Sequence, residues 1–455
     1  MFRHIKHIHF VGIGGIGMSG IAELLVNLGY KITGSDRALS PITDRLESLG
    51  VRIFTGHSEE NIGTADVVVY SSAIQPSNPE VRGARSRKIP CIPRVEILGE
   101  LMRMKEGIAI AGTHGKTTTT SMVGKILESA GLDPTIVIGG RLRSLGVNAK
   151  LGDSKFMVCE VDESDKLLVN LSPIINVITT IDEDHLDNYK DINEIKDTFV
   201  KFANRIPFYG CNIICGEDEN IRSILPRIKK RCVSYGFGEH CNLKLRDYQL
   251  GAPSYFRVQS NGDDFGEFTL SLPGIHNILN ACAAISVGVE LEIPISIIKT
   301  AVSEFKGVHR RFELKGEARG IRIIDDYGHH PREIEVTLRA AREIFKGRII
   351  VIFQPHLFSR TQKLKDRFAN CFWDADYVII PPIYASRESP VEGITGKLIV
   401  DAAISRGYKN IAYIEEKEEI FQWCLNNLKP DDTLFTIGAG DVYKIGEELL
   451  NRIRV

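Results

Sequence analysis

The segment that most constrains this chain is Gly112-Thr113-His114-Gly115-Lys116-Thr117-Thr118. It follows the apolar run Ile108-Ala109-Ile110-Ala111 and precedes a stretch with helical spacing of apolar residues. A glycine loop between a strand and a helix lets backbone N–H groups face phosphate oxygens at the positive end of the helix dipole. The Lys116 ammonium would reach the terminal phosphates, and the hydroxyl of Thr117 or Thr118 would hold Mg²⁺. The segment therefore predicts a nucleoside triphosphate site in a sheet of alternating strands and helices.

Length and composition narrow the class of protein. The 455 residues exceed one ordinary domain, and 43% hydrophobic with 25% charged residues is typical of a soluble globular protein. The formal net charge of −1 argues against a nucleic-acid partner, and no apolar run is long enough to span a bilayer. The start of the chain lacks a secretory signal and the nine cysteines are scattered, so reduced thiols and a cytoplasmic location are expected. Cys211 and Cys215 have no second pair at zinc spacing, which disfavours a structural metal site there.

Alternating strand and helix patterns predict an α/β protein of three domains, covering residues 1–107, 108–308 and 309–455. The first and third are expected to be Rossmann-like, and the central one a P-loop-type ATP-binding domain. Residues 232–272 are polar and rich in strand formers, which predicts a small extra antiparallel sheet. The expected strands cover residues 8–11, 30–33, 67–70, 108–111, 156–159, 174–178, 212–215, 322–327, 348–353, 377–380 and 433–438.

A second glycine loop lies near the start of the chain. Gly12, Gly14 and Gly17 fit G-x-G-x-x-G before a predicted helix at 19–29, and Asp36 follows 19 residues after Gly17. Such a loop suits NAD or FAD, but the same geometry binds any diphosphate, and the aspartate can bind any ribose or base edge. A tight turn without a ligand is a further interpretation. Because another phosphate loop follows later in the chain, the pair favours a nucleotide-linked substrate together with ATP.

The loop at 112–118 departs from the usual G-x-x-x-x-G-K-[ST] pattern. Ile110 stands where the first glycine would fall. Four successive threonines, residues 117–120, follow Lys116. Threonine is a poor helix former, so this run favours a binding role over a simple glycine-rich turn.

Acids and a histidine follow the strands next to this loop. Glu160 ends a predicted strand, and ligands in open α/β sheets gather at the carboxyl ends of strands. Its carboxylate is therefore a candidate ligand for a metal that bridges ATP oxygens. His185, flanked by Asp184 and Asp187, is a candidate to ligate a second Mg²⁺ or hold a water. A solvated acidic turn and a structural histidine are the respective alternatives.

A third polar loop, Asp325-Asp326-Tyr327-Gly328-His329-His330-Pro331, ends a predicted strand of the last domain. Its density of polar residues between a glycine and a proline favours a site over a solvated loop.

Taken in order along the chain, these segments resemble those of the Mur ligases of peptidoglycan synthesis. Each segment is modest alone, but the ordered set spans nearly the whole length and is specific. The matching segments are Val11-Gly12-Ile13-Gly14-Gly15-Ile16-Gly17-Met18-Ser19, the loop at 112–118, Glu160-Val161-Asp162-Glu163-Ser164-Asp165, Asp184-His185-Leu186-Asp187, Pro273-Gly274-Ile275-His276-Asn277 with Asn280, His309-Arg310-Arg311-Phe312, the loop at 325–331, Gln354-Pro355-His356 with Arg360, and Gly438-Ala439-Gly440-Asp441.

The resemblance implies a role for each matching residue. Expected to bind a UDP-sugar are Gly14, Gly15, Ile16, Gly17, Asp36, His57, Ser71 and Ser72. Expected to bind ATP are Gly112, Thr113, His114, Gly115, Lys116, Thr117, Thr118, His276, Asn277, Asn280, Arg311 and Asp326. Expected to face the reacting carboxylate and the amino acid are Tyr327, His329, His356 and Arg360. The implied metal ligands are Thr117, Glu160 and His185, and the implied catalytic residues are Lys116, Glu160, His185, Arg311 and His329.

The resemblance also implies an activity. An ATP-dependent ligase would join L-alanine to the lactyl carboxylate of UDP-N-acetylmuramate through an acyl phosphate, giving ADP and phosphate. It would use two Mg²⁺ ions and act as a monomer or homodimer in the cytoplasm. His185 and His329 are both candidates for the proton acceptor. The chain departs from the family at Leu357, where relatives often carry arginine after the Gln-Pro-His segment, and Lys201 is only near the place of the carbamylated lysine of several relatives.

Three other functions are alternatives to this one. A related ligase would add another amino acid or a recycled peptide, but the Gly14-Gly15-Ile16-Gly17-Met18-Ser19 loop favours alanine. An NAD-dependent dehydrogenase would leave the loop at 112–118 unexplained. A non-catalytic nucleotide sensor does not need acids and histidines from three separate segments.

Overall fold

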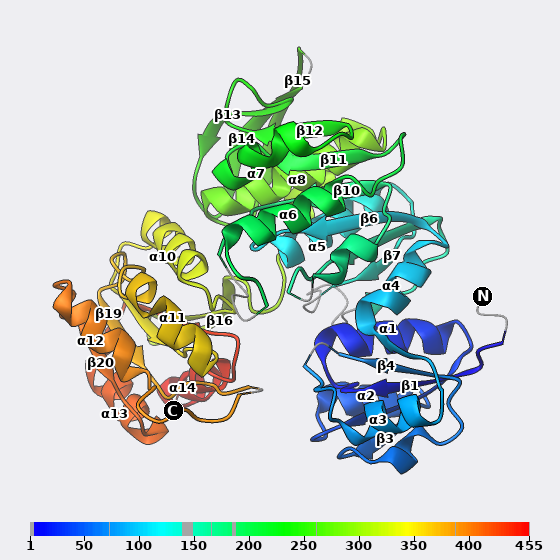
Figure 1. The fold of residues 1–455 in the computed structure, drawn as a ribbon. Helices are drawn as coiled ribbons and strands as arrows, with labels where there is room; N and C mark the ends of the chain where they lie inside the picture. The colour runs from blue at the N-terminus through cyan, green and yellow to red at the C-terminus, as the bar shows by residue number, and fades with distance from the viewer. Residues whose placement is uncertain are drawn as a thin grey trace. The chain divides into compact units, whose positions relative to one another are not determined.

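The structure is a computed structural model that describes residues 4–71, 73–138, 149–164, 166–183, 188–260, 262–386 and 388–454, with the side chain of Ile16 left out (Figure 1). The chain divides into two compact units. The first unit comprises Met1–Arg246, Arg257–Gly266 and Leu279–Phe305. The second unit comprises Asp247–Phe256, Glu267–Ile278 and Lys306–Val455.

A five-stranded sheet opens the first unit. Its strand order is β3-β2-β1-β4-β5, and all neighbouring strands are parallel. The predicted helix at 19–29 is α1, which begins earlier, at Ile16, because the glycine loop runs directly into its first turn. The strands are β1 (His7–Val11), β2 (Lys31–Asp36), β3 (Arg52–Thr55), β4 (Val67–Tyr70) and β5 (Cys91–Pro93), and the helices are α1 (Ile16–Asn27), α2 (Pro41–Ser48), α3 (Pro79–Ser86) and α4 (Arg94–Met102).

A larger sheet of ten strands follows, in the order β15-β14-β13-β12-β11-β10-β6-β9-β7-β8. The strands expected at 232–272 do not stand apart, because β12 pairs in parallel with β11 and with β13 and so extends the central sheet. The strands are β6 (Glu106–Ala111), β7 (Thr135–Val137), β8 (Ala149–Lys150), β9 (Phe156–Glu160), β10 (Ile175–Ile178), β11 (Cys211–Cys215), β12 (Cys232–Gly236), β13 (Leu243–Gln249), β14 (Ser254–Ser260) and β15 (Asp263–Leu270).

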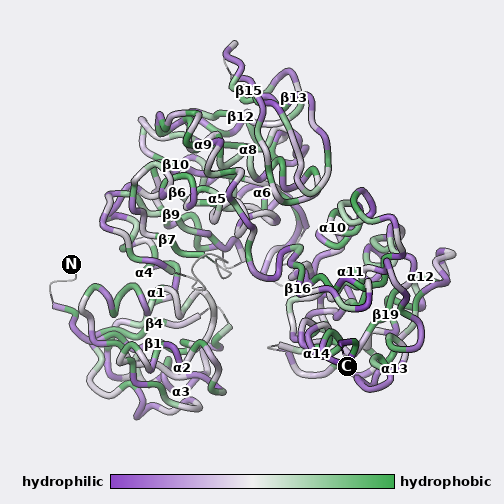
Figure 2. The backbone as a smooth tube through the Cα atoms, turned by 180° about the vertical axis from the view of Figure 1, so that it is seen from behind, coloured by the Kyte–Doolittle hydropathy of each residue, from purple (hydrophilic) through white to green (hydrophobic). Residues whose placement is uncertain are grey.

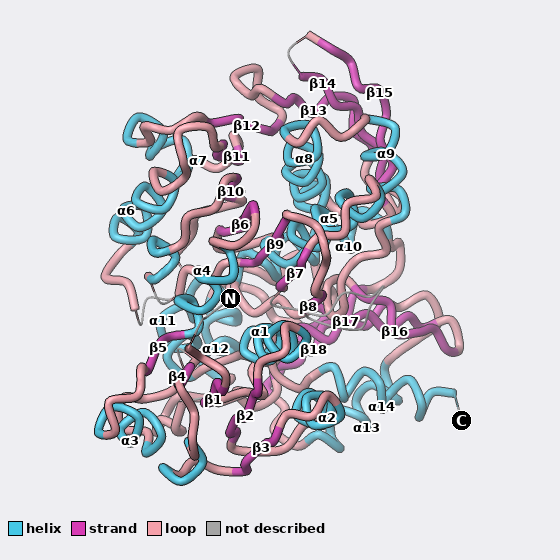
Figure 3. The backbone as a smooth tube through the Cα atoms, turned by 90° about the vertical axis from the view of Figure 1, so that its right-hand side faces the viewer, coloured by secondary structure: helices cyan, strands magenta, loops and turns pink. Residues whose placement is uncertain are grey.

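Helices cover both faces of the central sheet. Figure 3 shows α6 and α7 on one face, with α5, α8 and α9 on the other. These helices are α5 (Lys116–Ser129), α6 (Ile192–Ala203), α7 (Glu219–Ile224), α8 (Ile275–Glu290) and α9 (Ile295–Glu304). The arrangement is the doubly wound architecture that alternating strands and helices predict.

The second unit holds a six-stranded sheet, in the order β16-β17-β21-β18-β19-β20. Only the β16–β17 pair is antiparallel among the strand pairs of this sheet. The strands are β16 (Glu313–Ala318), β17 (Ile321–Asp326), β18 (Ile349–Phe353), β19 (Tyr377–Ile380), β20 (Ile411–Tyr413) and β21 (Thr433–Ile437). The helices are α10 (Pro331–Ile344), α11 (Phe358–Phe368), α12 (Lys397–Ser405), α13 (Lys417–Asn427) and α14 (Tyr443–Arg454).

The hydrophobic cores lie between the sheets and their helices. The residues of β6 from Ile108 to Ala111 and the whole of β18 are fully buried, as expected for central strands covered on both faces. In Figure 2 the hydrophobic colouring follows such strands, and hydrophilic residues are concentrated in the loops. Among the described residues, no helix has the length and apolar character needed to cross a membrane.

Candidate active site

The first glycine loop turns tightly at the carboxyl end of β1, which lies between β2 and β4. Gly12 has φ +79°, a conformation that glycine adopts readily, and the N–H groups of Gly12 and Ile13 donate to the carbonyl of Ser35 at 2.8 and 3.0 Å. The Gly14 N–H donates to Asp36 Oδ2 at 2.8 Å. A Cβ on Gly14 would lie only 2.8 Å from that oxygen. The structure thus brings the predicted loop and the predicted aspartate into direct contact.

Ser71 also lies at this loop. A Cβ on Gly12 would be 3.2 Å from Ser71 Oγ. A Cβ on Gly17 would be 2.1 Å from Arg94 Nη1, so a side chain there would displace the arginine. Ser72 and the side chain of Ile16, both predicted to contact the UDP-sugar, lie outside the described residues.

A buried carboxylate lies next to this loop. Glu80 on α3 is 0% exposed, and its oxygens lie 2.6 Å from Ser35 Oγ, 2.9 Å from His57 Nδ1, 2.7 Å from Asn61 Nδ2 and 3.5 Å from His9 Nε2. Burial raises the pKa of Glu80, but hydrogen bonds from His9, Ser35 and Asn61 outweigh this effect and hold the pKa below its usual value. Glu80 therefore positions His57, a predicted UDP-sugar residue. It also positions Ser35 of β2, whose carbonyl accepts the hydrogen bonds from the glycine loop.

The second glycine loop leaves β6, which lies between β10 and β9 at the switch point of the central sheet. Gly112 and Gly115 have φ of +130° and +82°. A Cβ on Gly112 would lie 2.2 Å from Thr179 Oγ1, and a Cβ on Gly115 would lie 2.3 Å from Asn280 Oδ1. Both glycines are therefore required by conformation and by space, and the predicted ATP residue Asn280 lies against the loop.

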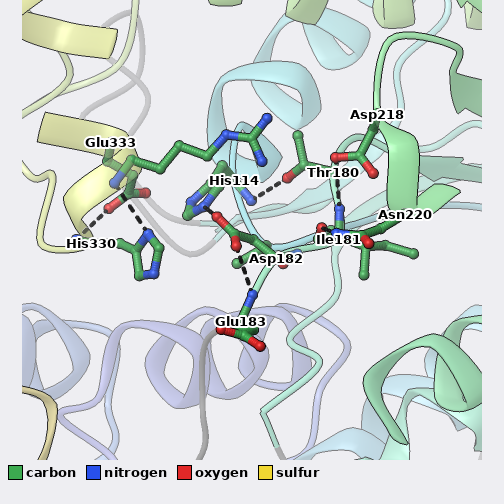
Figure 4. Close-up of polar contacts among 12 residues, drawn as sticks. His114, Thr180, Ile181, Asp182, Glu183, Asp218, Asn220, His330 and Glu333 are labelled. Atoms are coloured by element: carbon green, nitrogen blue, oxygen red, sulfur yellow. Dashed lines mark hydrogen bonds and ion pairs between the residues drawn. The ribbon is translucent and has the colours of Figure 1, made fainter. Parts of the chain in front are cut away.

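The segment that follows β10 holds this loop in place. The N–H groups of Thr113 and His114 donate to the carbonyl and the hydroxyl oxygen of Thr180, both at 2.9 Å (Figure 4). The Asp182 N–H donates to Thr113 Oγ1 at 2.9 Å, and His114 Nε2 lies 3.3 Å from Asp182 Oδ2. Thr179 Oγ1 donates to the carbonyl of His114 at 2.5 Å. Asp182, which is not among the predicted site residues, fixes the conformation of the loop.

Lys116 begins helix α5 directly after the loop. Its Nζ donates to the carbonyl of Gly112 at 2.6 Å and lies 3.0 and 3.1 Å from the two carboxylate oxygens of Glu163. Burial lowers the pKa of Lys116, but the negative charges of Glu163, Asp162 and Glu160 outweigh it and place the pKa above its usual value. The ammonium is therefore charged at neutral pH and directed by Glu163, which is only 2% exposed.

Two of the three predicted metal ligands, Thr117 and Glu160, are oxygen donors at one sheet edge. Glu160 ends β9 and is paired in the parallel register with Ile110, two residues before the loop. Thr117 lies buried in the first turn of α5. Carboxylate and hydroxyl oxygens are the ligands that Mg²⁺ prefers, so these two residues fit a magnesium ion. His185, the third predicted ligand, lies outside the described residues.

In the second unit, a pair of aspartates ends β17. Asp326 Oδ1 accepts from the Gly328 N–H and Oδ2 from the Phe312 N–H, both at 2.8 Å. Burial raises the pKa of Asp326 to about 6, against the opposing attraction of Arg311. Asp325 is 0% exposed and binds the guanidinium of Arg310 at 2.9 Å.

The predicted amino-acid residues gather beside Asp326. The rings of Tyr327 and His329 are 5.6 Å apart, and those of His329 and His356 are 5.9 Å apart. Arg360 Nη1 lies 3.1 Å from His356 Nδ1, and the ring of Tyr384 stacks on that of His356 at 5.9 Å. All four predicted residues therefore form one cluster at the carboxyl ends of β17 and β18, together with Tyr384.

Glu333 on α10 organises the loop that carries this cluster. Its Oε2 accepts from the His329 N–H at 3.0 Å and from the His330 N–H at 3.2 Å. Figure 4 shows Glu333 beside His330. Its Oε1 lies 3.5 Å from Arg311 Nη1. Burial and the positive charge of Arg311 lower the pKa of His276 to about 4, so this predicted ATP residue is neutral at physiological pH. Leu357, the family departure, is buried with φ +70° at the start of α11, so it adds no charge to the site.

The predicted ATP residues are divided between the units. The glycine loop and Asn280 belong to the first, whereas His276, Asn277, Arg311 and Asp326 belong to the second. Three acids that the sequence analysis passed over, Glu80, Asp182 and Glu333, hold predicted residues in place. Glu163 was part of a matched segment but received no role, although it is the carboxylate partner of Lys116.

The chain is similar to known proteins over its whole length. Three family models match in order: the Mur ligase family catalytic domain over residues 7–106, the Mur ligase middle domain over 110–288, and the Mur ligase glutamate ligase domain over 310–440. The UDP-N-acetylmuramate–L-alanine ligase of Geobacter sp. (strain M21) is 53% identical over 100% of this chain and 99% of that protein. The protein of the same name from Geobacter sulfurreducens is 50% identical with the same coverage.

Two solved structures are similar over almost the full length. The UDP-N-acetylmuramate-alanine ligase MurC of Thermotoga maritima has a TM-score of 0.84 and 32% identity, with 99% of both chains covered. A murein peptide ligase of Psychrobacter arcticus has a TM-score of 0.75 and 25% identity, again with 99% of both chains covered.

Proposed function

The chain belongs to the Mur ligase family, and from that premise we propose that it joins L-alanine to the carboxylate of UDP-N-acetylmuramate with conversion of ATP to ADP and phosphate. The observation that carries this proposal is the 53% identity, over the whole chain, to a relative named for that reaction. The structure supports it with a glycine loop at the switch point of each of the first two sheets.

The chemistry explains why such an enzyme needs two phosphate-binding loops, one for ATP and one for the nucleotide-linked substrate that carries the carboxylate. A carboxylate is a poor electrophile, because its charge repels a nucleophile and oxide is not a leaving group. If a carboxylate oxygen attacks the γ-phosphorus of ATP, ADP departs and an acyl phosphate forms. The neutral amine of alanine then attacks the acyl carbon, and phosphate departs from the tetrahedral intermediate with one former carboxylate oxygen. Positioning and charge stabilisation supply most of the acceleration in such phosphoryl transfers.

We assign the phosphate-binding role to the loop at 112–118. Lys116, charged and directed by Glu163, would neutralise charge on the transferred phosphoryl group. Thr117 and Glu160 would hold Mg²⁺, which supplies charge neutralisation at the phosphate oxygens when it is bound. The number of magnesium ions and a role for His185 remain part of the proposal and rest on the family resemblance.

The first glycine loop would receive the diphosphate of the UDP-sugar, with Asp36, His57 and Ser71 near the nucleoside. In the second unit, Arg311 and Asp326 would meet the ATP phosphates and ribose, and His276 and Asn277 the adenine. Tyr327, His329, His356 and Arg360 would meet the reacting carboxylate and the amino acid. Of the two candidate acceptors for the proton of the attacking amine, His329 is the one that lies among the described residues.

A reconstituted assay tests the reaction. Purified protein is given ATP, Mg²⁺, UDP-N-acetylmuramate and each amino acid in turn, and released phosphate is measured with the mass of the product. We expect release to require all four components and the product mass to show one added alanine residue. Release that needs no UDP-N-acetylmuramate, or that requires a peptide in place of alanine, would refute the proposed function.

Glu80→Gln is expected to weaken UDP-sugar binding, because a neutral amide cannot replace the anion that His57 and Ser35 contact. Loss of hydrogen bonds to a charged group costs about 1.5–3 kcal/mol, which corresponds to a KM for UDP-N-acetylmuramate roughly 10- to 100-fold higher. The turnover number at saturation should change little, since Glu80 is a positioning residue. Glu60→Gln, on an exposed residue of the same domain, is the matched control. An unchanged KM in the Glu80 variant would remove Glu80 from the site.

The buried carboxyl of Asp326 leads us to expect that both activity and stability depend on pH. Its pKa is raised by burial to about 6, so in the free protein the carboxyl is protonated below that pH. We expect kcat/KM for ATP to fall as the pH drops through about 6, and Asp326→Asn to have a lower plateau without this limb. Because the pKa is higher in the folded than in the unfolded chain, this group's contribution to stability falls as pH rises from about 4 to about 6. The same acidic limb in the Asp326→Asn variant would assign it to another group.

A further inference from the structure

A set of mixed metal-binding side chains lies in the central domain, apart from the residues assigned to ATP. Glu217, His240 and Cys241 each offer one ligand atom, and the three atoms all lie within 4.8 Å of one another. Glu217 follows β11, whereas His240 and Cys241 lie in the loop between β12 and β13. The two segments are neighbours because β11 and β12 pair in parallel.

The Glu217 carboxylate is held in a fixed orientation. Its Oε1 accepts from the N–H groups of Phe237 and Gly238, at 2.7 and 3.1 Å. These bonds hold the carboxylate from the backbone side, and the carboxylate offers one oxygen to the cluster. Ligating carboxylates are commonly oriented by such outer hydrogen bonds.

The imidazole of His240 is oriented in the manner of a metal ligand. Its Nε2 lies 3.1 Å from the carbonyl oxygen of Gly216, which can only accept a hydrogen bond. In the neutral ring the proton therefore lies on Nε2, and Nδ1 keeps its lone pair. Metal-binding histidines usually donate their other ring N–H to a carbonyl or carboxylate in this way.

Three glycines surround the ligand groups. A Cβ on Gly216 would lie 2.4 Å from Cys241 Sγ, and a Cβ on Gly236 would lie 2.4 Å from Glu217 Oε1. A Cβ on Gly238 would lie 2.2 Å from His240 Cε1. Side chains at these positions would cover or displace all three groups, so the glycines allow them to converge.

The surroundings are rich in sulfur. Cys241 is 2% exposed, and the thiols of Cys215 and Cys241 lie near enough to Cys282 to raise its pKa, after the larger effect of burial. Arg222 is a neighbouring cation, and it donates to the carbonyl of Gly216 at 2.7 Å. A metal with affinity for sulfur suits this environment better than Mg²⁺.

We propose that Glu217, His240 and Cys241 bind a divalent transition metal of the zinc class, at a site separate from the magnesium ligands of the ATP site. One thiolate, one imidazole and one carboxylate supply three positions of a tetrahedron, and a water completes it. The Cys241 thiol loses its proton to solvent on binding, and no other covalent bond changes. The bound ion would crosslink the turn after β11 and the loop between β12 and β13.

Cobalt titration of the full-length protein tests this site. The protein is freed of metal with a chelator, supplied with excess Mg²⁺ and ADP to occupy the magnesium site, and titrated with Co²⁺ without oxygen. We expect one equivalent of Co²⁺ to produce the near-ultraviolet charge-transfer band of a cobalt–thiolate bond, and Zn²⁺ to displace it. The absence of that band would overturn the proposal.

Variants identify the ligands. Cys241→Ser should abolish the band, and His240→Ala, at an exposed side chain, should weaken Co²⁺ binding about tenfold or more. Cys91→Ser and His4→Ala, both in the first domain, are matched controls that should leave band and affinity unchanged. Circular dichroism checks that each variant is folded. A band that survives Cys241→Ser, equal affinity in His240→Ala, or loss of the band in the controls would each refute the site.

Discussion

Lys116→Met is expected to reduce alanine-dependent phosphate release strongly while UDP-N-acetylmuramate still binds. Removing one cationic donor aimed at developing charge lowers turnover by about 10²–10³-fold in comparable sites. The binding of UDP-N-acetylmuramate should be unchanged, because its proposed loop leaves β1 of a different sheet. Turnover is measured by phosphate release and binding by calorimetry.

The control for this variant is Lys125→Met. Lys125 lies on the same helix, α5, and pairs with Glu304 at 2.8 Å on the surface. The Lys125→Met variant should retain normal turnover, since a surface ion pair contributes little to stability. Turnover in the Lys116 variant within tenfold of the unmodified protein, or loss of UDP-sugar binding in the folded variant, would contradict the assignment of the two loops.

Arg310→Ala is expected to destabilise the second unit strongly. The guanidinium binds buried Asp325 at 2.9 Å and also donates to the carbonyls of Gly438 and Gly440 at 2.6 and 3.0 Å. Its loss leaves a carboxylate buried without its partner, which costs about 3–5 kcal/mol. The free energy of unfolding is measured by denaturant titration with a probe in the second unit.

Two further variants test the cause of this loss. Arg322→Ala removes a looser pair, 3.4 Å from Glu317, and should change stability by less than about 1 kcal/mol. Arg310→Ala combined with Asp325→Asn should be more stable than Arg310→Ala alone, because no charge stays buried. Equal losses for Arg310→Ala and Arg322→Ala would show that the buried charge is not the reason.

Local features of the sequence predicted most of the fold. Buried strands such as β4 and β19 coincide with their predicted bounds, because a short apolar run between turn residues forms few structures other than a buried strand. The two glycine loops were equally predictable, because the strand, the glycines and the helix follow one another directly in the sequence. The extension of the central sheet by β12 and β13 was not predicted, because strand order depends on pairing between distant segments.

The supporting acids were not predictable in the same way. Glu80 lies on a helix among polar residues, and an isolated acid in that context is usually solvated. Its full burial arises only when the fold brings it beside Ser35 of β2 and His57. Asp182 likewise gains its contact with His114 only through the pairing of β6 with β10. The residues that bind and the residues that orient them therefore differ in how far sequence can predict them.

The central claim is that the carboxylate is activated by phosphoryl transfer. UDP-N-acetylmuramate labelled with ¹⁸O in the lactyl carboxylate tests it most directly, with the mass of the released phosphate as the readout. The proposed route predicts that each turnover with ATP and L-alanine transfers one ¹⁸O from the carboxylate to phosphate, with ADP as the other product. Unlabelled phosphate, or formation of AMP, would contradict it.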